Sequence, residues 1–327
     1  MHQIGSSETT REMLITQLMI RKQDFVQRGS ARSLFLQCRS FGDRFDDYIR
    51  FGTPSHKPNP DLSFLEWFVG FFEAEGSFLQ WPDNNKKDRF GIEVTQKDEK
   101  LIHKIRSELG FGLITKIIKN DQTYCRYYVH SLENLRRVIS LFNGNLVMVK
   151  RQERFKNWLS SFNQKHNTTF LFSQTKPQIS LKNAWLSGFL EGDAGFYVRP
   201  TNLVRCNKNG SMKYDIQMKF YITQKGEQEV LCQIKDLFQI QTDIYQITDG
   251  KSNEKYNRIE THRLECHSLL IDYLTRYCFR GKRFIIFKRW ERILGYRMKN
   301  YPITEKSVLK LKRLIATINA KRESAPK

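Results

Sequence analysis

The sequence predicts an α+β protein built from two copies of one αββαββα unit. The first observation is a duplicated stretch: LEWFVGFFEAEGSF at residues 65–78 returns as NAWLSGFLEGDAGF at residues 183–196. The second is that both copies precede alternating apolar and polar runs, typical of strands, and periodic runs typical of helices. The third is a formal net charge of +21 over 327 residues, which favours a polyanion as the partner.

The duplicated stretch is expected to form a helix in each copy. Ser63 and Glu66 have the spacing of a capping box at the start of the first helix, and Gly76 is expected to end it in a left-handed conformation. Small residues recur four positions apart on one face of each copy: Gly70 and Ala74, then Gly188 and Gly192. Such a face suits a helix that packs closely on its own duplicate.

An acid stands near the end of each copy, and a crossing of the two helices would bring these acids together. They are Glu75 and Asp193. Two carboxylates held close to each other repel unless a cation lies between them, and oxygen ligands of this kind suit Mg²⁺. We therefore expect Glu75 and Asp193 to be catalytic residues and ligands of Mg²⁺. Glu73 and Glu191, two residues earlier, would point to another side of each helix and are expected to be structural or capping groups.

This paired motif resembles the LAGLIDADG homing endonucleases, in the single-chain form with two motifs. The second copy departs from the family pattern at Ala194, which stands where Gly76 stands in the first. The resemblance covers about residues 60–320. It implies a monomer whose two pseudo-symmetric αββαββα halves pack through the paired helices, with antiparallel sheets that form a saddle over double-stranded DNA.

The chain divides into five segments on this interpretation: an N-terminal appendage at 1–60, the first half at 61–162, a linker at 163–180, the second half at 181–300, and a C-terminal helix and tail at 301–327. In the first half, strands are expected at 77–81, 89–96, 113–118 and 123–129, with a turn at Asn120 and Asp121. Helices are expected from Asp98 to Gly110, from Ser131, and over 150–162. A last helix at 304–319 carries an apolar stripe: Val308, Leu311, Ile315 and Ile318.

The second half repeats the order of the first with a growing offset. The Thr-Gln-Lys at 95–97 returns at 223–225, the His-Ser-Leu at 130–132 at 267–269, and the Lys-Arg at 150–151 at 288–289. We place the extra residues in two loops, at 201–213 and near 249–256, because insertions between strands leave a sheet undisturbed. These loops add basic side chains: Arg205, Lys208, Lys213, Lys251 and Lys255.

Four further residues are implied as catalytic by the resemblance. Gln96 and Gln224, at the ends of matched strands, align with the family position beside the scissile phosphates. Lys150 and Lys288 match the family's active-site lysine, a point charge able to polarise water or steady a phosphate. In each pair, recurrence at matching places favours this role over that of an ordinary solvated side chain.

The strand pairs of each half are expected to read DNA. Their wet positions carry side chains able to contact base edges and phosphates in a major groove. With one residue from the insertion, these expected DNA-binding residues are Gln80, Arg89, Glu93, Thr95, Arg126, Tyr128, Arg199, Arg205, Gln217, Lys219, Tyr221 and Thr223.

Several functional classes are disfavoured by composition. No stretch reaches the roughly 18 uninterrupted apolar residues of a spanning helix, and the six cysteines form no CxxC pair or zinc-like spacing.

The expected function is a site-specific homing endonuclease that makes a Mg²⁺-dependent double-strand break at a long DNA target, encoded in a mitochondrion or chloroplast. The alternative is a derived RNA-binding maturase or ribosomal RNA factor, with structured RNA as its partner and no cleavage.

Overall fold

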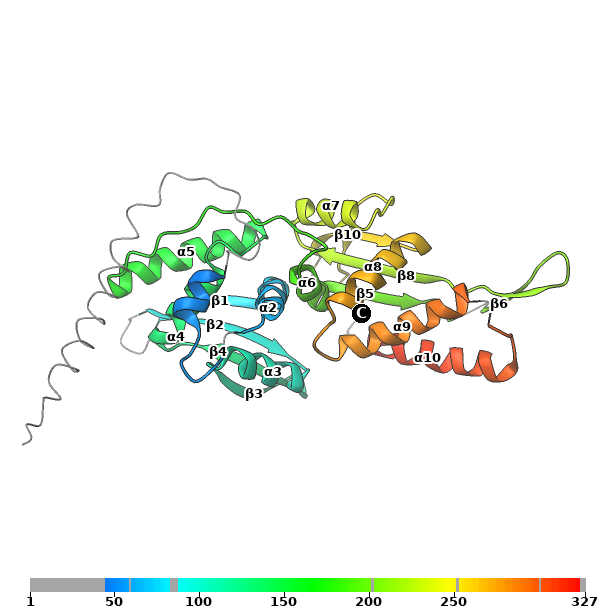
Figure 1. Cartoon of the computed structure of the whole chain (residues 1–327), viewed down its shortest axis with the longest axis horizontal. Helices are drawn as coiled ribbons and strands as arrows, with labels where there is room; N and C mark the ends of the chain where they lie inside the picture. Colours follow the sequence, from blue (N-terminus) through cyan, green and yellow to red (C-terminus); the bar gives the residue numbers. More distant parts are fainter. Residues whose placement is uncertain are drawn as a thin grey trace, which may run out of the picture. The chain divides into compact units, whose positions relative to one another are not determined.

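Two antiparallel sheets form the framework of the protein. The structure, a computed structural model, describes residues 45–58, 60–82, 88–200, 203–250, 253–299 and 301–323. Each main sheet has four strands, in the order β1-β2-β4-β3 and β5-β8-β10-β9, and β6 pairs with β7 in a separate ribbon. The equivalent strand orders confirm the expected α+β fold with two repeated halves (Figure 1).

The first half follows the expected order of elements. These are α2 (Leu62–Glu75), β1 (Gly76–Pro82), β2 (Asp88–Gln96), α3 (Glu99–Leu109), β3 (Leu113–Lys119), β4 (Gln122–Val129), α4 (Leu132–Phe142) and α5 (Val149–His166). Gly110 ends α3 with φ of 76°, as its place after the apolar stripe predicts. Asn120 and Asp121 both have positive φ, which fits the tight turn expected between β3 and β4.

The second half repeats this order with one added hairpin and one added helix. Its elements are α6 (Trp185–Asp193), β5 (Ala194–Val198), β6 (Val204–Cys206), β7 (Met212–Tyr214), β8 (Met218–Gln224), α7 (Gln228–Leu237), β9 (Tyr245–Thr248), β10 (Lys255–Thr261), α8 (Leu264–Arg276), α9 (Arg283–Met298) and α10 (Glu305–Glu323). The insertion expected as a loop at 201–213 therefore contains a strand pair, in which Arg205 lies opposite Lys213.

Helices α2 and α6 pack against each other through their glycines, as the sequence predicts (Figure 1). A Cβ atom on Gly70 would lie 2.0 Å from the carbonyl oxygen of Trp185, and one on Gly188 would lie 1.8 Å from that of Trp67. Real Cβ atoms do not come so close to backbone oxygens, so only glycine permits this crossing. The contact joins the two halves along their duplicated helices.

The ends of the duplicated helices differ from the expectation. Asp61 and not Ser63 caps α2, because its carboxylate accepts from the main-chain N–H of Ser63 at 3.0 Å. Glu66 instead accepts from the N–H of Ala184 at 2.9 Å, and so holds the start of the other helix. Gly76 is extended, with φ of −90° and ψ of 168°, and leads directly into β1.

A steric contact explains why Gly76 and Ala194 differ although both continue directly into a strand. A Cβ atom on Gly76 would lie 2.2 Å from the ring of Phe72. Ala194 has a similar backbone, with φ of −81° and ψ of 152°, and its methyl group is accommodated. The departure of the second copy from the family pattern therefore leaves the helix ending unchanged.

Ring contacts give a smaller offset between the later parts of the two halves than the sequence predicts. Phe78 packs on Phe155 and Trp158 with ring centroids 5.2 Å and 5.8 Å apart. Phe196 makes the same contacts with Phe287 and Trp290, at 6.0 Å and 5.3 Å. Each residue of α9 is therefore equivalent to the residue of α5 that lies 132 positions earlier. The two helices also end at equivalent residues, His166 and Met298.

The same offset applies at the preceding strand and helix. Pairing of Thr95 with Arg126, and of Thr223 with Arg258, aligns β4 with β10 at 132. His262 is thus the counterpart of His130, and Lys282 that of Lys150. The expected matches of His130 with His267 and of Lys150 with Lys288 are therefore wrong. Short stretches similar to His-Ser-Leu and Lys-Arg occur more than once in the second half, so their resemblance does not show which residues occupy equivalent positions.

The expected N-terminal appendage is partly built into the first half. Residues 1–44 lie outside the described residues, but Phe45 and Tyr48 are only 2% and 1% exposed. The short helix η2 (Tyr48–Gly52) packs on α4, where Arg137 donates to the carbonyl of Gly52 at 2.9 Å. Residues 45–52 therefore pack on the first half although η2 has no counterpart among the described elements of the second, and the division of the chain at residue 60 stays a prediction.

The expected C-terminal helix is confirmed as α10. Leu311, Ile315 and Ile318 are buried, and Asn319 donates to the carbonyl oxygen of Val198 in β5 at 2.8 Å. Tyr214 of the added hairpin donates to the hydroxyl of Ser307 at 2.8 Å, so α10 also supports that hairpin. Within the described ranges, no helix is both long and apolar enough to cross a bilayer.

Candidate active site

Glu75 and Asp193 lie together where the two crossed helices end. Glu75 is the last residue of α2 and Asp193 the last of α6, and both are partly buried. The small residues Ala74 and Gly192 allow this approach, since a Cβ atom on Gly192 would lie 2.4 Å from that of Ala74 and 3.5 Å from Oε1 of Glu75. The predicted proximity of the two acids is therefore present.

The surroundings of the two acids disfavour two negative charges. Burial raises the pKa of Glu75 above its ordinary value. Burial, followed by the neighbouring charge of Glu75, raises the pKa of Asp193 to about 7. Two desolvated carboxylates with raised pKa values form a site where a cation would remove an unfavourable repulsion.

A glutamine from the adjacent strand contacts each acid. Gln96, at the end of β2, hydrogen-bonds to Glu75 and lowers its pKa. Gln224, at the end of β8, donates through Nε2 to Oδ2 of Asp193. The structure thus brings together four of the six residues predicted as catalytic, while their catalytic roles remain a prediction.

Two arginines that the sequence reading missed hold the helix ends that carry the acids. Arg151 of α5 donates from Nε to the carbonyl of Glu73 at 2.8 Å and from Nη1 to that of Gly76 at 2.7 Å. Arg283 of α9 donates to the carbonyl of Gly192 at 3.1 Å. Both arginines lower the pKa of Asp193 by their charge. They satisfy carbonyls left without helical partners and place positive charge at the negative helix ends.

The sequence contains a pattern that identifies these arginines, but only when the two halves are aligned at the offset of 132. Arg151 follows Lys150, and Arg283 follows Lys282, so a Lys-Arg pair begins each equivalent helix at the offset of 132. The pair at 288–289 obscured this relation, because it has the same residue types six positions later. Ring contacts between each duplicated sheet and its helix identify the correct pair.

The lysine that begins each of these helices binds the other half. The main-chain N–H of Lys150 donates to Glu227 at 3.1 Å, and its Nζ donates to a carbonyl at residue 225 at 2.9 Å. The N–H of Lys282 donates to Asp98 at 2.6 Å. Asp98 and Glu227 begin α3 and α7, directly after the strands that end in Gln96 and Gln224. Lys150 and Lys282 are therefore related by the pseudo-twofold symmetry.

Lys288 lies further along α9. Its Nζ pairs with Glu291, three residues later on the same helix. It does not occupy the position equivalent to Lys150, which Lys282 holds. A catalytic role for Lys288 remains a prediction, and the geometry provides Lys282 as the matched alternative.

Glu73 and Glu191 are structural, as expected from their place on the helices. Glu73 accepts from the N–H of Met148 at 2.7 Å and from the indole of Trp185 at 2.6 Å. Glu191 accepts from the N–H of Gly281 at 2.6 Å and from the indole of Trp67 at 2.9 Å. Each glutamate thus joins the opposite helix to the segment before α5 or α9, and burial raises its pKa, to about 8 for Glu73.

The donors around the acid pair suit a hard cation. In the part of the chain that the structure describes, no cluster of three or more His, Cys, Asp and Glu side chains is placed to bind a metal. The five cysteines there are free thiols. A cation at the crossing would therefore use the carboxylates of Glu75 and Asp193, with amide or main-chain oxygens and water completing the oxygen shell that Mg²⁺ prefers.

The wet face of the first sheet carries the residues expected to read DNA. Phe90, Ile92 and Val94 face the core from β2 while the side chains of Arg89, Glu93 and Thr95 remain exposed or half-buried. None of the twelve residues expected to bind DNA is buried: Gln80, Arg89, Glu93, Thr95, Arg126, Tyr128, Arg199, Arg205, Gln217, Lys219, Tyr221 and Thr223. Their exposure is consistent with binding, which remains a prediction residue by residue.

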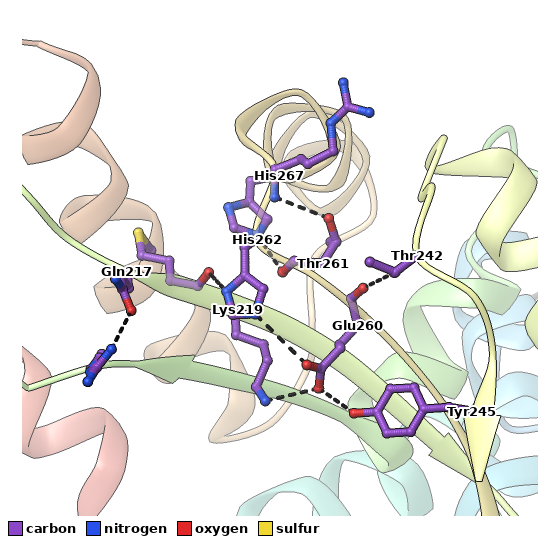
Figure 2. Close-up of polar contacts among 11 residues, drawn as sticks. Gln217, Lys219, Thr242, Tyr245, Glu260, Thr261, His262 and His267 are labelled. Atoms are coloured by element: carbon purple, nitrogen blue, oxygen red, sulfur yellow. Dashed lines mark hydrogen bonds and ion pairs between the residues drawn. The ribbon is translucent and has the colours of Figure 1, made fainter.

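A charged network covers the equivalent face of the second sheet. Figure 2 shows Glu260 accepting from Lys219 at 2.9 Å and from the hydroxyl of Tyr245 at 2.8 Å. Arg258, which the sequence reading missed, donates to Thr223 at 2.9 Å and lies 4.8 Å from the ring centroid of Tyr221. It is the counterpart of Arg126, whose guanidinium lies 5.0 Å from the ring centroid of Tyr128. An arginine therefore lies over a tyrosine ring in both sheets, although the two tyrosines, Tyr128 on β4 and Tyr221 on β8, are not equivalent.

Comparisons with known proteins agree with this architecture. A family model described as LAGLIDADG endonuclease matches residues 68–162 and 186–294. The chain is 31% identical over 233 residues to a probable intron-encoded endonuclease of Neurospora crassa, covering 70% of this chain and 39% of that protein. It is 23% identical over 312 residues to an uncharacterised cox1 intron-2 protein of Schizosaccharomyces pombe, covering 92% of this chain and 85% of that one.

Solved structures show the same fold. The LAGLIDADG meganuclease I-AabMI bound to uncleaved DNA superposes with a TM-score of 0.60 at 17% identity, covering 78% of this chain and 99% of that one. I-CpaMI bound to uncleaved DNA gives a TM-score of 0.57, with the same identity and the same coverage of both chains. Two family segments, each containing one acid-bearing helix and one four-stranded sheet, account for the repeated halves. The chain belongs to the LAGLIDADG endonuclease family, in its two-motif form.

Proposed function

We propose that this protein is a site-specific homing endonuclease that cuts both strands of a long duplex DNA target with Mg²⁺. The observation that carries the proposal is the acid pair at the helix crossing, with Gln96 on Glu75 and Gln224 on Asp193. A packed core helix has no need to bury two like charges side by side. Two half-buried acids side by side at the ends of the crossed helices support a cation-dependent reaction.

Glu75 and Asp193 would hold the cation. When bound, Mg²⁺ activates water and stabilises charge on the phosphate and the leaving oxygen. Gln96 and Gln224 fix the orientation of the two carboxylates, and Arg151 and Arg283 fix the main chain beneath them. Lys150 and Lys282 place a positive charge at each side of the crossing, where each can steady one strand's phosphate; Lys288 is the alternative to Lys282.

The two wet sheet faces would bind the duplex on both sides of the acid pair. The net charge of +21 supports a polyanionic partner, and stacked Arg126 and Arg258 are suited to base edges or phosphates. Relatives named for cox1 and ND4 introns support intron homing in a mitochondrion, with the gene in the organelle. The chain spans only 39% of the Neurospora relative, so the proposed function concerns this chain and not that longer protein.

Cleavage of DNA without the intron tests the proposal. Wild-type protein in Mg²⁺ should linearise a plasmid carrying the joined exons that flank the host intron. Glu75→Gln and Asp193→Asn should each reduce this cleavage by at least about a hundredfold while leaving binding in Ca²⁺ largely unchanged, since only ligand charge is lost. Glu153→Gln, an exposed acid on α5, is the matched control and should cut normally.

The two lysine candidates can be separated in the same assay. Lys282→Met should reduce cleavage as Lys150→Met does, whereas Lys288→Met should have little effect. Equal cutting by the Glu75→Gln variant and the wild type would exclude the assigned metal site. A large effect of Lys288→Met without one of Lys282→Met would show that the pseudo-twofold register does not govern catalysis.

RNA splicing is the second candidate function. The chain is 24% identical over 165 residues, half of its length, to an intron-encoded RNA maturase of Saccharomyces cerevisiae. Incubation with precursor RNA of the host intron would test it. Faster splicing with wild-type protein, together with intact DNA in the cleavage assay, would favour this function over the endonuclease.

A further inference from the structure

We propose that a basic pocket at one end of the first sheet binds a phosphate group of the nucleic-acid backbone, at a position where the second half lacks counterparts of Arg89 and His166. The pocket has a volume of about 220 Å³. Its polar lining is Arg89, His130, Lys165 and His166, and its apolar lining is Phe90, Leu132 and Leu135. It is separate from the acid pair.

The chemistry of the lining suits an anion. An arginine, a lysine and two imidazoles offer nitrogen donors, and no carboxylate is among the described side chains that line the pocket. Burial is the largest cause that lowers the pKa of His166, and the charges of Lys165 and Arg136 lower it further, which indicates a positive potential there. A phosphate would accept from several of these donors at once.

The imidazoles are held in place by neighbouring rings. His166 lies with its ring centroid 4.5 Å from that of Phe162 and 6.0 Å from that of Phe90. His130 stacks on Tyr128 at 5.5 Å with an interplanar angle of 18°. The two imidazoles therefore have little side-chain freedom to lose when a ligand binds, which lowers the entropic cost of binding.

The second half provides an internal comparison at the same fold position. At the established offsets, Gln217 replaces Arg89, Met218 replaces Phe90, and Met298 replaces His166. His262, the counterpart of His130, hydrogen-bonds the carbonyl of Met218 at 2.9 Å and lies 3.9 Å from Glu260 (Figure 2). An arginine and an imidazole are thus lost, and the remaining imidazole is bound to main chain beside an acid, while Arg297 stands where Lys165 stands in the first half.

This comparison separates folding from function in the basic pocket. Gln217 and Met298 occupy the equivalent elements of an intact sheet and helix, so the αββαββα unit does not require an arginine and a histidine there. At other lining positions the second half is basic too, since the buried His267 stands where Leu135 stands and Arg297 where Lys165 stands. Arg89 and His166 are therefore the two basic residues that the repeated fold does not demand.

The position of the pocket indicates which phosphate would reach it. Arg89 begins the wet row of β2, which continues through Glu93 and Thr95 to Gln96 beside the acid pair. A duplex lying along this row would carry its backbone past Arg89 at the outer end. This step rests on the proposed DNA binding, and it adds a contact that carries no sequence information on the first half's flank.

A swap between the halves tests the DNA contact. The double variant Arg89→Gln and His166→Met carries the second half's own residues, so it should fold normally. In Ca²⁺, the slope of log binding constant against log salt should fall in magnitude by about 0.9, the value for one phosphate contact. Protection from backbone cleavage should be lost on the first half's flank only.

A charge-matched control removes a basic residue elsewhere. Lys306→Gln lies on the exposed side of α10 and should leave the flank protection unchanged. The proposal is overturned if the swap variant keeps full protection, or if Lys306→Gln produces the same loss on the same flank, since the effect would then reflect net charge.

A second measurement needs no DNA. In NMR of the full chain with labelled histidines, inorganic phosphate should shift the rings of His130 and His166 to saturation, and Arg89→Gln should abolish the shifts. His262 and the exposed His103 are internal references that should not saturate. Equal responses of all four histidines overturn the pocket. Saturating shifts in a protein that does not bind duplex DNA support the pocket and overturn the proposed endonuclease instead.

Discussion

At the crossing of α2 and α6, each feature of the first half has a partner in the second. Trp67 binds Glu191 as Trp185 binds Glu73, and each acid contacts a glutamine at the end of its own sheet. Away from the crossing the halves differ. The first half has η2 packed on α4, whereas the second has the β6–β7 hairpin and α10. The two halves are therefore closely symmetric at the α2–α6 crossing and differ in the elements that lie away from it.

This difference reflects the kind of contact that each region makes. At the crossing, backbone touches backbone, so no side chain can adjust to absorb a change. At the outer ends, loops face solvent and tolerate inserted residues. The first place to test the comparison is therefore the glycine pair.

Replacing either crossing glycine should have the largest effect. Gly188→Ala would place a methyl group 1.8 Å from a carbonyl oxygen, and Gly70→Ala would place one at 2.0 Å. Because a whole helix must move to relieve this overlap, we expect the free energy of unfolding to fall by at least about 4 kcal/mol for each variant. Denaturant unfolding would measure it, with Gly250→Ala, which meets no atom within 4 Å, as the control. A loss below 1 kcal/mol would show that the crossing is loose.

The elements that the described residues form in only one half should come next. Tyr48→Ala removes a buried ring from η2, and Leu311→Ala removes a buried side chain from α10. We expect losses of about 3–5 and 2–5 kcal/mol. Deletion of residues 1–56 should likewise destabilise the protein, because it removes Phe45 and Tyr48 from the core. Folded, active protein after that deletion would restore the view of this segment as an appendage.

The sequence allowed the fold and the acid pair to be predicted because both depend on short-range or duplicated patterns. Helical spacing of glycines indicated the crossing, and alternation in β2 separated its core side from its wet side. Arg151 and Arg283 could not be placed in this way, since their partners are main-chain carbonyls distant in sequence. The alignment of α9 with α5 depends on which rings pack on Phe196. The two Lys-Arg pairs at 282–283 and 288–289 have the same sequence, so the sequence alone cannot show which pair is equivalent to Lys150 and Arg151.

A buried histidine gives the two halves different responses to acid. His267 occupies the position of Leu135, and burial lowers its pKa to about 4. Its folded pKa lies below the ordinary value of about 6.5, so the folded state binds fewer protons and loses stability as the pH falls through that interval. Between pH 7.5 and pH 5, wild-type protein should lose about 2 kcal/mol more than His267→Leu does.

Denaturant unfolding at the two pH values would measure this difference. The hydrogen bond from the imidazole to Thr261 shifts the stability of the variant equally at both pH values, so it cancels in the comparison. Parallel pH profiles for the wild type and the variant would mean that His267 takes up its proton at the same pH in the folded protein as in the unfolded chain.

The added hairpin should have the smallest effect, on DNA binding and not on folding. Arg205 and Lys213 face each other across β6 and β7, and Lys208 lies in the exposed turn between them. We expect the second half to cover more DNA than the first, so that the footprint of the uncut complex in Ca²⁺ is lopsided about the cleavage centre. Shortening residues 206–212 to an Asn-Gly turn, while keeping Tyr214 and its bond to Ser307, should weaken binding by about tenfold and relax sequence preference on one flank only. The acid pair is untouched, so cleavage of bound DNA should continue. A symmetric footprint, or a relaxation of both flanks alike, would mean that the hairpin points away from the duplex and serves only to support α10.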